Sequence, residues 1–305
     1  MKKSLTIVIK GFCMGAADVV PGVSGGTMAF ILGIYTQLIA AIKSFDSEWL
    51  KGIFSLDRAT VFFRPHFGFL VPLATGILMA LLFFTRIIPV PVLIRTHPEI
   101  IYSLFFGLIA GSIFALLRQL GRLTIREITY IATGIIIGLF LFNLVPASTP
   151  DDSWFIFLSG ALAICAMLLP GISGSFILLM LKKYAYIFNA IGYFEFTVII
   201  PFLLGVISGL VLFSRILSYF LDNYYRPTIL FILGLLCASL WVIWPFQERV
   251  YEIIRGKERL VQSVPVFPDH LDFSIGYSVF MCMLGLFAVL LIDRYTYRQK
   301  VTGDE

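Results

Sequence analysis

Residues 21–35 read PGVSGGTMAFILGIY, and residues 170–184 read PGISGSFILLMLKKY. The two stretches share Pro, Gly, Ser, Gly, Leu and Tyr at equivalent positions, and they begin 149 residues apart in a chain of 305. Both lie inside long apolar segments. A match at about half the chain length indicates an internal duplication, and an internal duplication predicts a fold built from two similar halves.

A second pair of matching stretches follows the first pair in the same order. PLATGILMALLFFTRI starts at Pro72 and PFLLGVISGLVLFSRI starts at Pro201, and they share Pro, Gly, Leu, Phe, Arg and Ile. This pair is only 129 residues apart, so the first half needs a longer linker, which fits the polar stretch Lys43–His66. We therefore predict two repeats, residues 1–150 and residues 151–305.

Composition places both repeats in a membrane. The chain is 59% hydrophobic and 13% charged, with a mean hydropathy of +0.95, whereas soluble domains are about a quarter charged. Several apolar runs approach the roughly 20 residues that cross a bilayer core of ~30 Å. We expect an all-α polytopic membrane protein. The net charge of +5 comes from basic loops between spans and does not indicate nucleic-acid binding.

Each repeat is expected to contain a Pro-Gly-broken helical hairpin, either re-entrant or fully crossing, followed by three transmembrane helices. The hairpin returns to its starting side, so each repeat crosses the membrane an odd number of times. The second repeat is then inverted relative to the first, as in many secondary transporters. The expected segments are hairpin 5–42 and spans about 67–86, 98–117 and 127–146 in the first repeat, and hairpin 154–191 and spans about 196–216, 227–246 and 274–293 in the second.

Charged residues in the loops set the expected orientation. Lys2, Lys3 and the basic stretch 43–64 fall on the side of the N-terminus, whereas the loop after the third span carries Asp151 and Asp152 without Lys or Arg. The loop 246–272 falls on the opposite side and departs from this bias, because it contains basic residues. The positive-inside bias predicts that both termini are cytoplasmic.

The Pro-Gly pairs predict breaks in two helices. Pro21 and Pro170 lack an N–H and interrupt a helix, and Gly22 and Gly171 permit backbone angles that other residues avoid. Unpaired backbone groups in lipid are costly, so such breaks occur only inside protein or along a wet cavity. We therefore expect the two breaks to face each other near the middle of the membrane.

A helix that restarts after such a break presents free N–H groups and the positive end of its dipole. This arrangement binds anions, and phosphate is a natural ligand. The alternative is that small residues only let the helices pack closely. The candidate phosphate-binding residues are Ser24, Gly25, Gly26, Thr27, Ser173, Gly174 and Ser175.

Three ionisable residues in apolar segments are further candidates. Asp18 precedes Pro21, and its repeat equivalent is Met167; it is a candidate either for proton coupling or for capping nearby N–H groups. Arg86 and Arg215 match each other in the repeats. They are candidates for drawing in an anionic head group, or for snorkelling to lipid phosphates. We expect no metal site, because His and Cys lack ligand spacing, and no cofactor.

The run GFCMGAADVVPGVSGGTMAFILGIYTQLI (residues 11–39) resembles the opening signature of a bacterial family of polyprenyl-phosphate transporters. LLPGISGSFILLMLKKY (residues 168–184) and the repeat pattern are also similar to that family. The resemblance implies a bacterial inner-membrane protein that returns undecaprenyl phosphate, the C55 lipid carrier of envelope synthesis, to the cytoplasmic leaflet. Its partners would be this or a related polyprenyl phosphate and the surrounding membrane lipids.

Two other functions stay open. PGVSGGT also looks like the Pro-Gly-x-Ser-Arg-Ser-x-x-Thr motif of integral-membrane undecaprenyl-diphosphate phosphatases. That family also has a paired-glutamate motif on an early helix. Here Gly25 replaces the arginine, and no Glu occurs before Glu48. Hydrolysis would therefore lack its charge clamp and its acid–base or metal support. A secondary transporter of a small anion is equally compatible with the repeats. We therefore favour a transporter that is not an enzyme.

Overall fold

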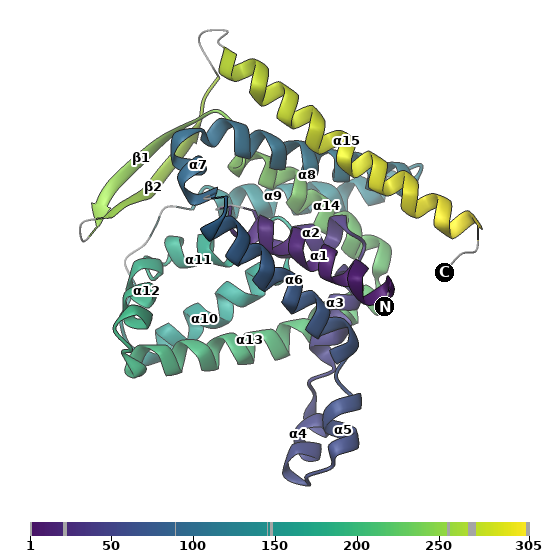
Figure 1. The fold of residues 1–305 in the computed structure, drawn as a ribbon, viewed down its shortest axis with the longest axis vertical. Helices are drawn as coiled ribbons and strands as arrows, with labels where there is room; N and C mark the ends of the chain where they lie inside the picture. The colour runs from purple at the N-terminus through teal and green to yellow at the C-terminus, as the bar shows by residue number, and fades with distance from the viewer. Residues whose placement is uncertain are drawn as a thin grey trace.

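The computed structural model describes residues 2–20, 23–88, 90–144, 146, 149–254, 257–267 and 273–302. Pro21 and Gly22 of the first break lie outside the described residues. The helices of the first half, labelled in Figure 1, are α1 (Lys2–Asp18), α2 (Gly25–Ile31), α3 (Tyr35–Lys43), α4 (Ser47–Phe54), α5 (Arg58–Phe63), α6 (Phe67–Arg86), α7 (Val90–Thr96), α8 (Pro98–Leu120) and α9 (Ile125–Phe142). Those of the second half are α10 (Ser153–Leu168), α11 (Gly174–Met180), α12 (Tyr184–Gly192), α13 (Phe196–Asn223), α14 (Tyr225–Val242) and α15 (Phe273–Thr302).

Among the described residues, five helices are long and apolar enough to cross a membrane: α6, α8, α9, α13 and α14. The 23 residues of α8 extend about 35 Å at 1.5 Å per residue, which exceeds the apolar thickness of a bilayer. Two further helices, α10 and the stretch Ile275–Leu291 of α15, are apolar but shorter. The prediction of a multi-pass helical membrane protein is confirmed.

A two-stranded antiparallel hairpin departs from the expected all-helical fold. Strands β1 (Gln247–Ile254) and β2 (Lys257–Pro265) pair from Gln247 opposite Pro265 to Ile254 opposite Lys257. The strands lie in the charge-rich stretch 246–272, for which the sequence predicts a loop. A two-stranded ribbon leaves unpaired backbone groups along both edges, which water can satisfy.

The linker Lys43–His66 also contains regular structure. It forms α4 and α5, which project from one end of the molecule (Figure 1). Two aspartates start these helices: Asp46 accepts a hydrogen bond from Trp49 N at 3.0 Å, and Asp57 accepts one from Ala59 N at 3.0 Å. Such N-caps satisfy backbone donors that the first turn of a helix leaves free.

The long helices pack in four side-by-side pairs, and two of these pairs join the halves. α1 packs along α6 and α10 along α13, each within one half. In contrast, α8 packs along α15, and α9 packs along α14. The helices that end one half therefore lie against helices of the other half, and the chain forms one interlocked body.

Glycines show the direction of these pairs. A Cβ placed on Gly107 of α8 would meet the backbone of Cys282, and one on Gly111 would meet the backbone of Leu286. The two residue numbers rise together, so α8 and α15 run parallel. The same order of contacts holds at the glycines of the other three pairs. Small residues let helix backbones approach closely in membranes.

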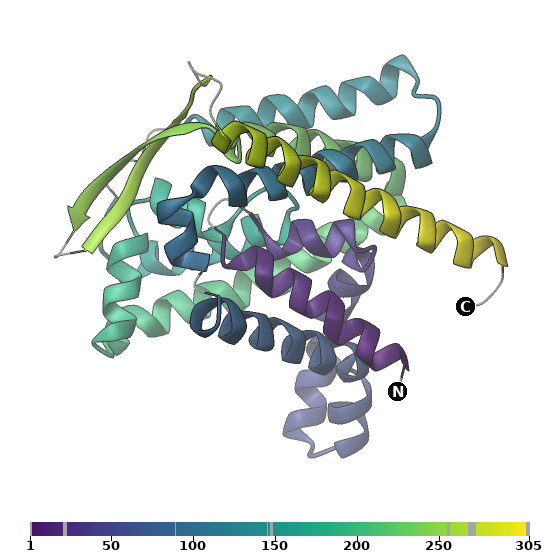
Figure 2. The same cartoon turned by 45° about the horizontal axis from the view of Figure 1, so that its top comes forward.

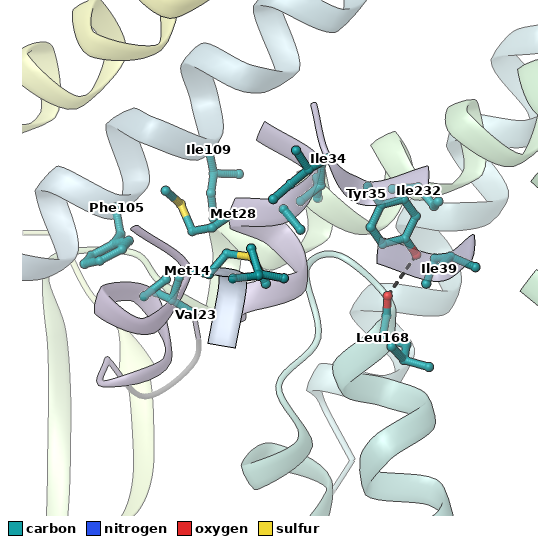
Figure 3. Packing of buried hydrophobic residues seen from close by; sticks show 14 of the residues in the cluster. Met14, Val23, Met28, Ile34, Tyr35, Ile39, Phe105, Ile109, Leu168 and Ile232 are labelled. Carbon is teal, nitrogen blue, oxygen red and sulfur yellow. Dashed lines mark hydrogen bonds between the residues drawn. The ribbon is translucent and has the colours of Figure 1, made fainter. Parts of the chain in front are cut away.

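The buried core surrounds the first break and the two short helices that follow it. Met14 of α1, Met28 of α2 and Ile39 of α3 pack there together with Ile109 of α8 and Ile232 of α14 (Figure 3). Helices from both halves therefore surround α2 and α3.

The start of α1 and the end of α15 lie at the same end of the molecule, away from the β-hairpin (Figures 1 and 2).

Candidate functional site

The structure brings the two breaks together. Gly171 N of the second break donates a hydrogen bond to Thr27 Oγ1 at 2.8 Å, and Ser24 Oγ donates one to Met167 O at 3.3 Å. A Cβ on Gly26 would lie 2.7 Å from the same Met167 oxygen. Side chains after the first break thus satisfy backbone groups that the second break leaves without helical partners.

A tyrosine completes this junction. Tyr35 begins α3 and is buried, and its hydroxyl donates a hydrogen bond to Leu168 O at 2.8 Å (Figure 3). Leu168 is the last residue of α10, so its carbonyl lies where intrahelical donors run out. The Tyr that the two repeat stretches share therefore anchors the first return arm to the second break.

The N-terminus of α2 already holds a carboxylate from the same chain. Asp18 accepts a hydrogen bond from Gly25 N at 2.7 Å, and Ser24 Oγ accepts one from Gly26 N at 3.1 Å. A Cβ on Gly25 would lie 2.6 Å from Asp18 Oδ2, so this approach requires glycine. Of the two roles considered for Asp18, the structure shows the capping geometry.

The N-terminus of α11 is different. Ser173 is its N-cap residue but makes no capping hydrogen bond with its side chain. Its hydroxyl instead lies 2.7 Å from Ser175 Oγ, and both residues are partly exposed. Because Met167 stands where the first repeat has Asp18, no equivalent carboxylate caps α11. The two breaks therefore differ in charge.

The candidate residues of the first break are more enclosed. Ser24 is 2% exposed and Thr27 is 1% exposed, and Gly25 and Gly26 are buried. The two hydroxyl groups make the hydrogen bonds that join the breaks. In this conformation, Ser173 and Ser175 are the more accessible hydroxyl groups.

Arg86 and Arg215 are exposed, and within the described part of the chain neither guanidinium makes an ion pair. Arg86 is the last residue of α6. Arg215 does not end its helix, because α13 continues to Asn223. The matching arginines therefore occupy different positions along their helices.

Two lysines near the far ends of the short helices were not singled out as site residues from the sequence. Lys10 Nζ donates a hydrogen bond to Leu32 O, the C-cap of α2, at 2.9 Å. Lys183, only 2% exposed, pairs with Asp151 and donates to Thr149 O at 2.9 Å. Cations at helix C-termini are stabilising. The signal available in the sequence was a lysine inside an otherwise apolar run.

The chemistry at the junction consists of hydroxyl groups, backbone N–H groups and one carboxylate. Among the described residues, no group of three or more His, Cys, Asp or Glu side chains is arranged to hold a metal ion. Groups of these kinds can bind an anion or move a proton. It offers no arginine clamp of the kind that stabilises a transferring phosphoryl group.

Comparison with known proteins gives a consistent assignment. The model of the undecaprenyl phosphate translocase-like family matches residues 14–260. A polyprenyl-phosphate transporter from Vibrio cholerae is 41% identical over 246 residues, which cover 81% of this chain and 79% of that protein. A polyprenyl-phosphate transporter from Staphylococcus aureus is 34% identical over 257 residues, which cover 78% of this chain and 85% of that protein. No solved structure matches the chain. Because the family model covers more than half of its length, this protein belongs to the undecaprenyl phosphate translocase-like family.

Proposed function

We propose that this protein translocates a polyprenyl phosphate across the membrane and does not hydrolyse it. The observation that carries this proposal is the junction of two helix breaks inside an apolar multi-pass body, in a chain whose relatives are named polyprenyl-phosphate transporters. A phosphate head group needs polar partners inside the bilayer, whereas its tail stays in lipid. The junction supplies the partners, and the exposed apolar faces of the helices supply a surface for the tail.

The specific substrate that we propose is undecaprenyl phosphate, moved from the outer to the cytoplasmic leaflet of a bacterial inner membrane. The family description supports this choice of lipid. Recycling to the cytoplasmic leaflet suits a carrier whose phosphate is left outside after each round of envelope synthesis.

Within the junction, we propose that the phosphate binds near Ser173 and Ser175. Their hydroxyl groups are partly exposed and bond to each other, so they can turn toward a ligand without breaking a contact between the halves. The corresponding position in the first repeat is closed by the Asp18 carboxylate. Protonation of Asp18 would reduce the negative charge facing the phosphate, and this is the step that we propose for coupling to protons.

We propose that the two repeats are inverted and that their hairpins are re-entrant. In support, α1 and α6 run parallel and therefore start on the same side, as do α10 and α13. Each return arm also bends at the same repeat position, because Gly33 has φ 68° and Lys182 has φ 52°. Short arms such as the 7 residues of α2 extend only about 10 Å.

We further propose that both termini are cytoplasmic. The start of α1 and the end of α15 lie at the same end of the molecule (Figure 1), which agrees with an even total number of crossings. The basic residues near the N-terminus place that end in the cytoplasm by the positive-inside bias. In this orientation the β-hairpin faces the outside.

Transport can be tested with the full chain in liposomes that contain undecaprenyl phosphate. The lipid exposed on the outer leaflet is measured by its cleavage with an added, membrane-impermeant phosphatase. We expect the cleavable fraction to rise from about one leaflet's share to nearly all of the lipid only when the protein is present. Liposomes with a single-span membrane protein serve as the control, and equal cleavage in both would contradict the proposal.

The same liposomes distinguish the other two functions. When undecaprenyl diphosphate replaces the substrate, we expect no inorganic phosphate to be released, and steady release would support the phosphatase. When inorganic phosphate is trapped inside, we expect no protein-dependent leak, and a rapid leak would support a small-anion transporter.

A further inference from the structure

The unit formed by α4, α5 and their connecting turn (residues 46–64, called the α4–α5 unit) exposes an apolar surface that covers no other part of the described chain. On α4, Leu50, Ile53 and Phe54 are exposed at positions i, i+3 and i+4, which lie on one face of a helix. Leu56 in the turn and Phe63 on α5 are 85% and 86% exposed. Ser55 is the C-cap residue of α4, and at 100° per residue it projects about 140° from Leu50 and about 160° from Ile53 around the helix axis.

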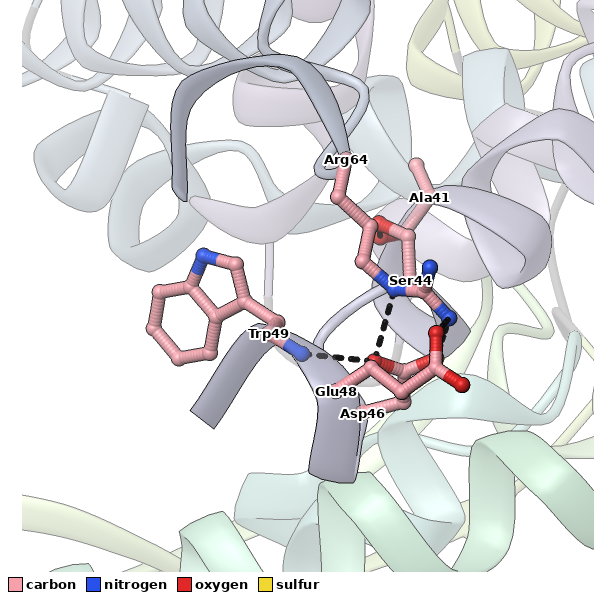
Figure 4. A network of polar contacts seen from close by, with 6 residues as sticks. All are labelled: Ala41, Ser44, Asp46, Glu48, Trp49 and Arg64. Atoms are coloured by element: carbon pink, nitrogen blue, oxygen red, sulfur yellow. Dashed lines mark hydrogen bonds and ion pairs between the residues drawn. The ribbon is translucent and has the colours of Figure 1, made fainter. Parts of the chain in front are cut away.

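Internal contacts close this unit without using that surface. Arg64 donates from Nε and from a terminal nitrogen to the two carboxylate oxygens of Asp46, at 2.9 Å and 2.6 Å, and it also pairs with Glu48 (Figure 4). Trp49 Nε1 donates to Val61 O at 3.2 Å. The exposed apolar side chains of the α4–α5 unit take no part in these internal contacts.

Its position places the unit beside the lipid bilayer. α5 leads through Arg64, Pro65 and His66 directly into α6, whose exposed Val71 and Leu78 face the region where lipid would lie. Because α6 runs parallel to α1, it begins on the side of the N-terminus. The unit extends sideways from that end of the bundle (Figure 1).

Two cations accompany the apolar surface. Lys51 and Arg58 are exposed, and within the described part of the chain neither makes an ion pair. Lysine and arginine beside exposed aromatic and aliphatic residues are typical of helices that lie in the membrane interface. Anionic lipid head groups attract such residues. The acidic side chains of the unit are held in its internal ion pairs and helix caps, which leaves these two cations to meet an external anion.

We propose that the α4–α5 unit lies in the membrane interface on the side of the N-terminus. Leu50, Phe54 and Phe63 insert between acyl chains, while Lys51 and Arg58 contact the phosphates of anionic lipids. The unit would hold the end of α3 and the start of α6 at a fixed depth in the bilayer. This inference depends on membrane insertion of the chain and not on the substrate that it transports.

The test uses the full chain, with its four cysteines replaced by alanine, in lipid nanodiscs. A nitrobenzoxadiazole label is attached at Leu50→Cys or Phe63→Cys, with Ser55→Cys as the matched control. We expect nitroxide groups on the lipid acyl chains to quench the first two labels several times more strongly than the third. If aqueous iodide quenches all three labels equally, the α4–α5 unit stands in water and the proposal fails.

The same labels separate lipid from a second copy of the chain. Donor- and acceptor-labelled copies are incorporated together in the same nanodisc. If both test sites are protected from iodide and energy transfer occurs between the copies, the surface mediates self-association and the proposal is overturned.

For the charges, we expect phosphatidylglycerol to increase lipid quenching at Leu50→Cys. The double substitution Lys51→Gln and Arg58→Gln should remove this increase, whereas Arg118→Gln on α8 should not. An increase that survives the double substitution would contradict binding of anionic lipid.

Discussion

Asp18 and Gly25 form one closed contact: the carboxylate accepts a hydrogen bond from the Gly25 N–H at 2.7 Å and fills the space that a Cβ on residue 25 would need. The contact joins the end of α1 to the start of α2 across the first break. It places a negative charge of the protein at the helix end where the sequence predicted a phosphate. The second break has no such charge, so the two breaks are not equivalent in chemistry.

Replacing Asp18 with Asn should impair transport and leave the protein folded. Asn keeps an acceptor for the Gly25 N–H but loses the charge and the proton, so the cost to stability should be no more than about 1 kcal/mol. Transport is measured with the phosphatase-accessibility assay, and folding by thermal denaturation in detergent. The control is Asp152→Asn, because Asp152 is an N-cap residue that makes no capping hydrogen bond with its side chain. Wild-type transport by Asp18→Asn would remove this proton site from the mechanism.

Replacing Gly25 with Ala should destabilise the protein through Asp18. The new methyl group would lie 2.6 Å from Asp18 Oδ2, so the carboxylate must shift and its hydrogen bond to Gly25 N must weaken. In the Asp18→Ala background the same change should cost much less, because neighbouring sites couple. Gly68→Ala is the control, since a Cβ there meets nothing within 4 Å. Equal shifts in melting temperature in both backgrounds would show that the contact does not matter.

Replacing Thr27 with Val should loosen the contact between the two breaks. Val has the shape of Thr but cannot accept the hydrogen bond from Gly171 N, and an unpaired buried donor costs about 1–3 kcal/mol. Thr27→Ser keeps the hydroxyl group and should lose less stability. Melting temperatures of the three proteins in one detergent make the comparison, and a Val variant as stable as the Ser variant would argue against this bond.

Replacing Ser173 and Ser175 together with Ala should lower transport with little change in stability. Their hydroxyl groups bond mainly to each other, so removing both leaves no unpaired donor behind. The matched control is Ser44→Ala, which also removes a partly buried serine hydroxyl group, at the end of α3. If transport persists at the wild-type rate, the phosphate binds elsewhere. Charge reversal of Arg86 and Arg215 then becomes the next test.

Acid should open the α4–α5 unit only at unusually low pH. The hydrogen bonds from Arg64, and then the bond from Trp49 N, hold the pKa of Asp46 well below its usual range. This contribution to stability is complete above the ordinary pKa of aspartate and is lost as the pH falls through the lowered value. Arg64→Gln should shift the transition up toward about pH 4, the ordinary aspartate range. Trp49 fluorescence, measured with the other three tryptophans replaced by Phe, reports the transition; an unchanged midpoint would contradict the role of Arg64.

The sequence predicted the features that have strong local signals. The apolar stretch 67–86 is the helix α6, and the repeated Pro-Gly stretches do meet in space. The repeat alignment places Asp18 opposite Met167. In the structure, this difference leaves α2 with a capping carboxylate and α11 without one. These features depend on residue type and chain length, which the sequence contains directly.

Other features could not be read from hydrophobic patterns. The membrane-spanning part of α8 and the stretch Ile275–Leu291 of α15 are apolar all round. Lipid covers the faces that protein does not, so hydrophobic periodicity does not identify the partners of these helices. The close contact between them lies at Gly107 and Gly111 of α8 and at Gly285 of α15. In the sequence, the stretch that forms the α4–α5 unit has the composition of a polar linker, because its charged residues outnumber its Phe and Leu residues. Its amphipathic arrangement is recognisable only when the helix bounds are known.

The pairing of α8 with α15 and of α9 with α14 restricts how the protein can move. A molecule whose halves met only across a flat interface would rock by tilting one half against the other. Here such tilting would pull four membrane helices out of their closest contacts, which glycines make tight. These four helices form a frame that belongs to both halves. Any opening of the junction must therefore come from movement of the hairpins, with α6 and α13, relative to that frame.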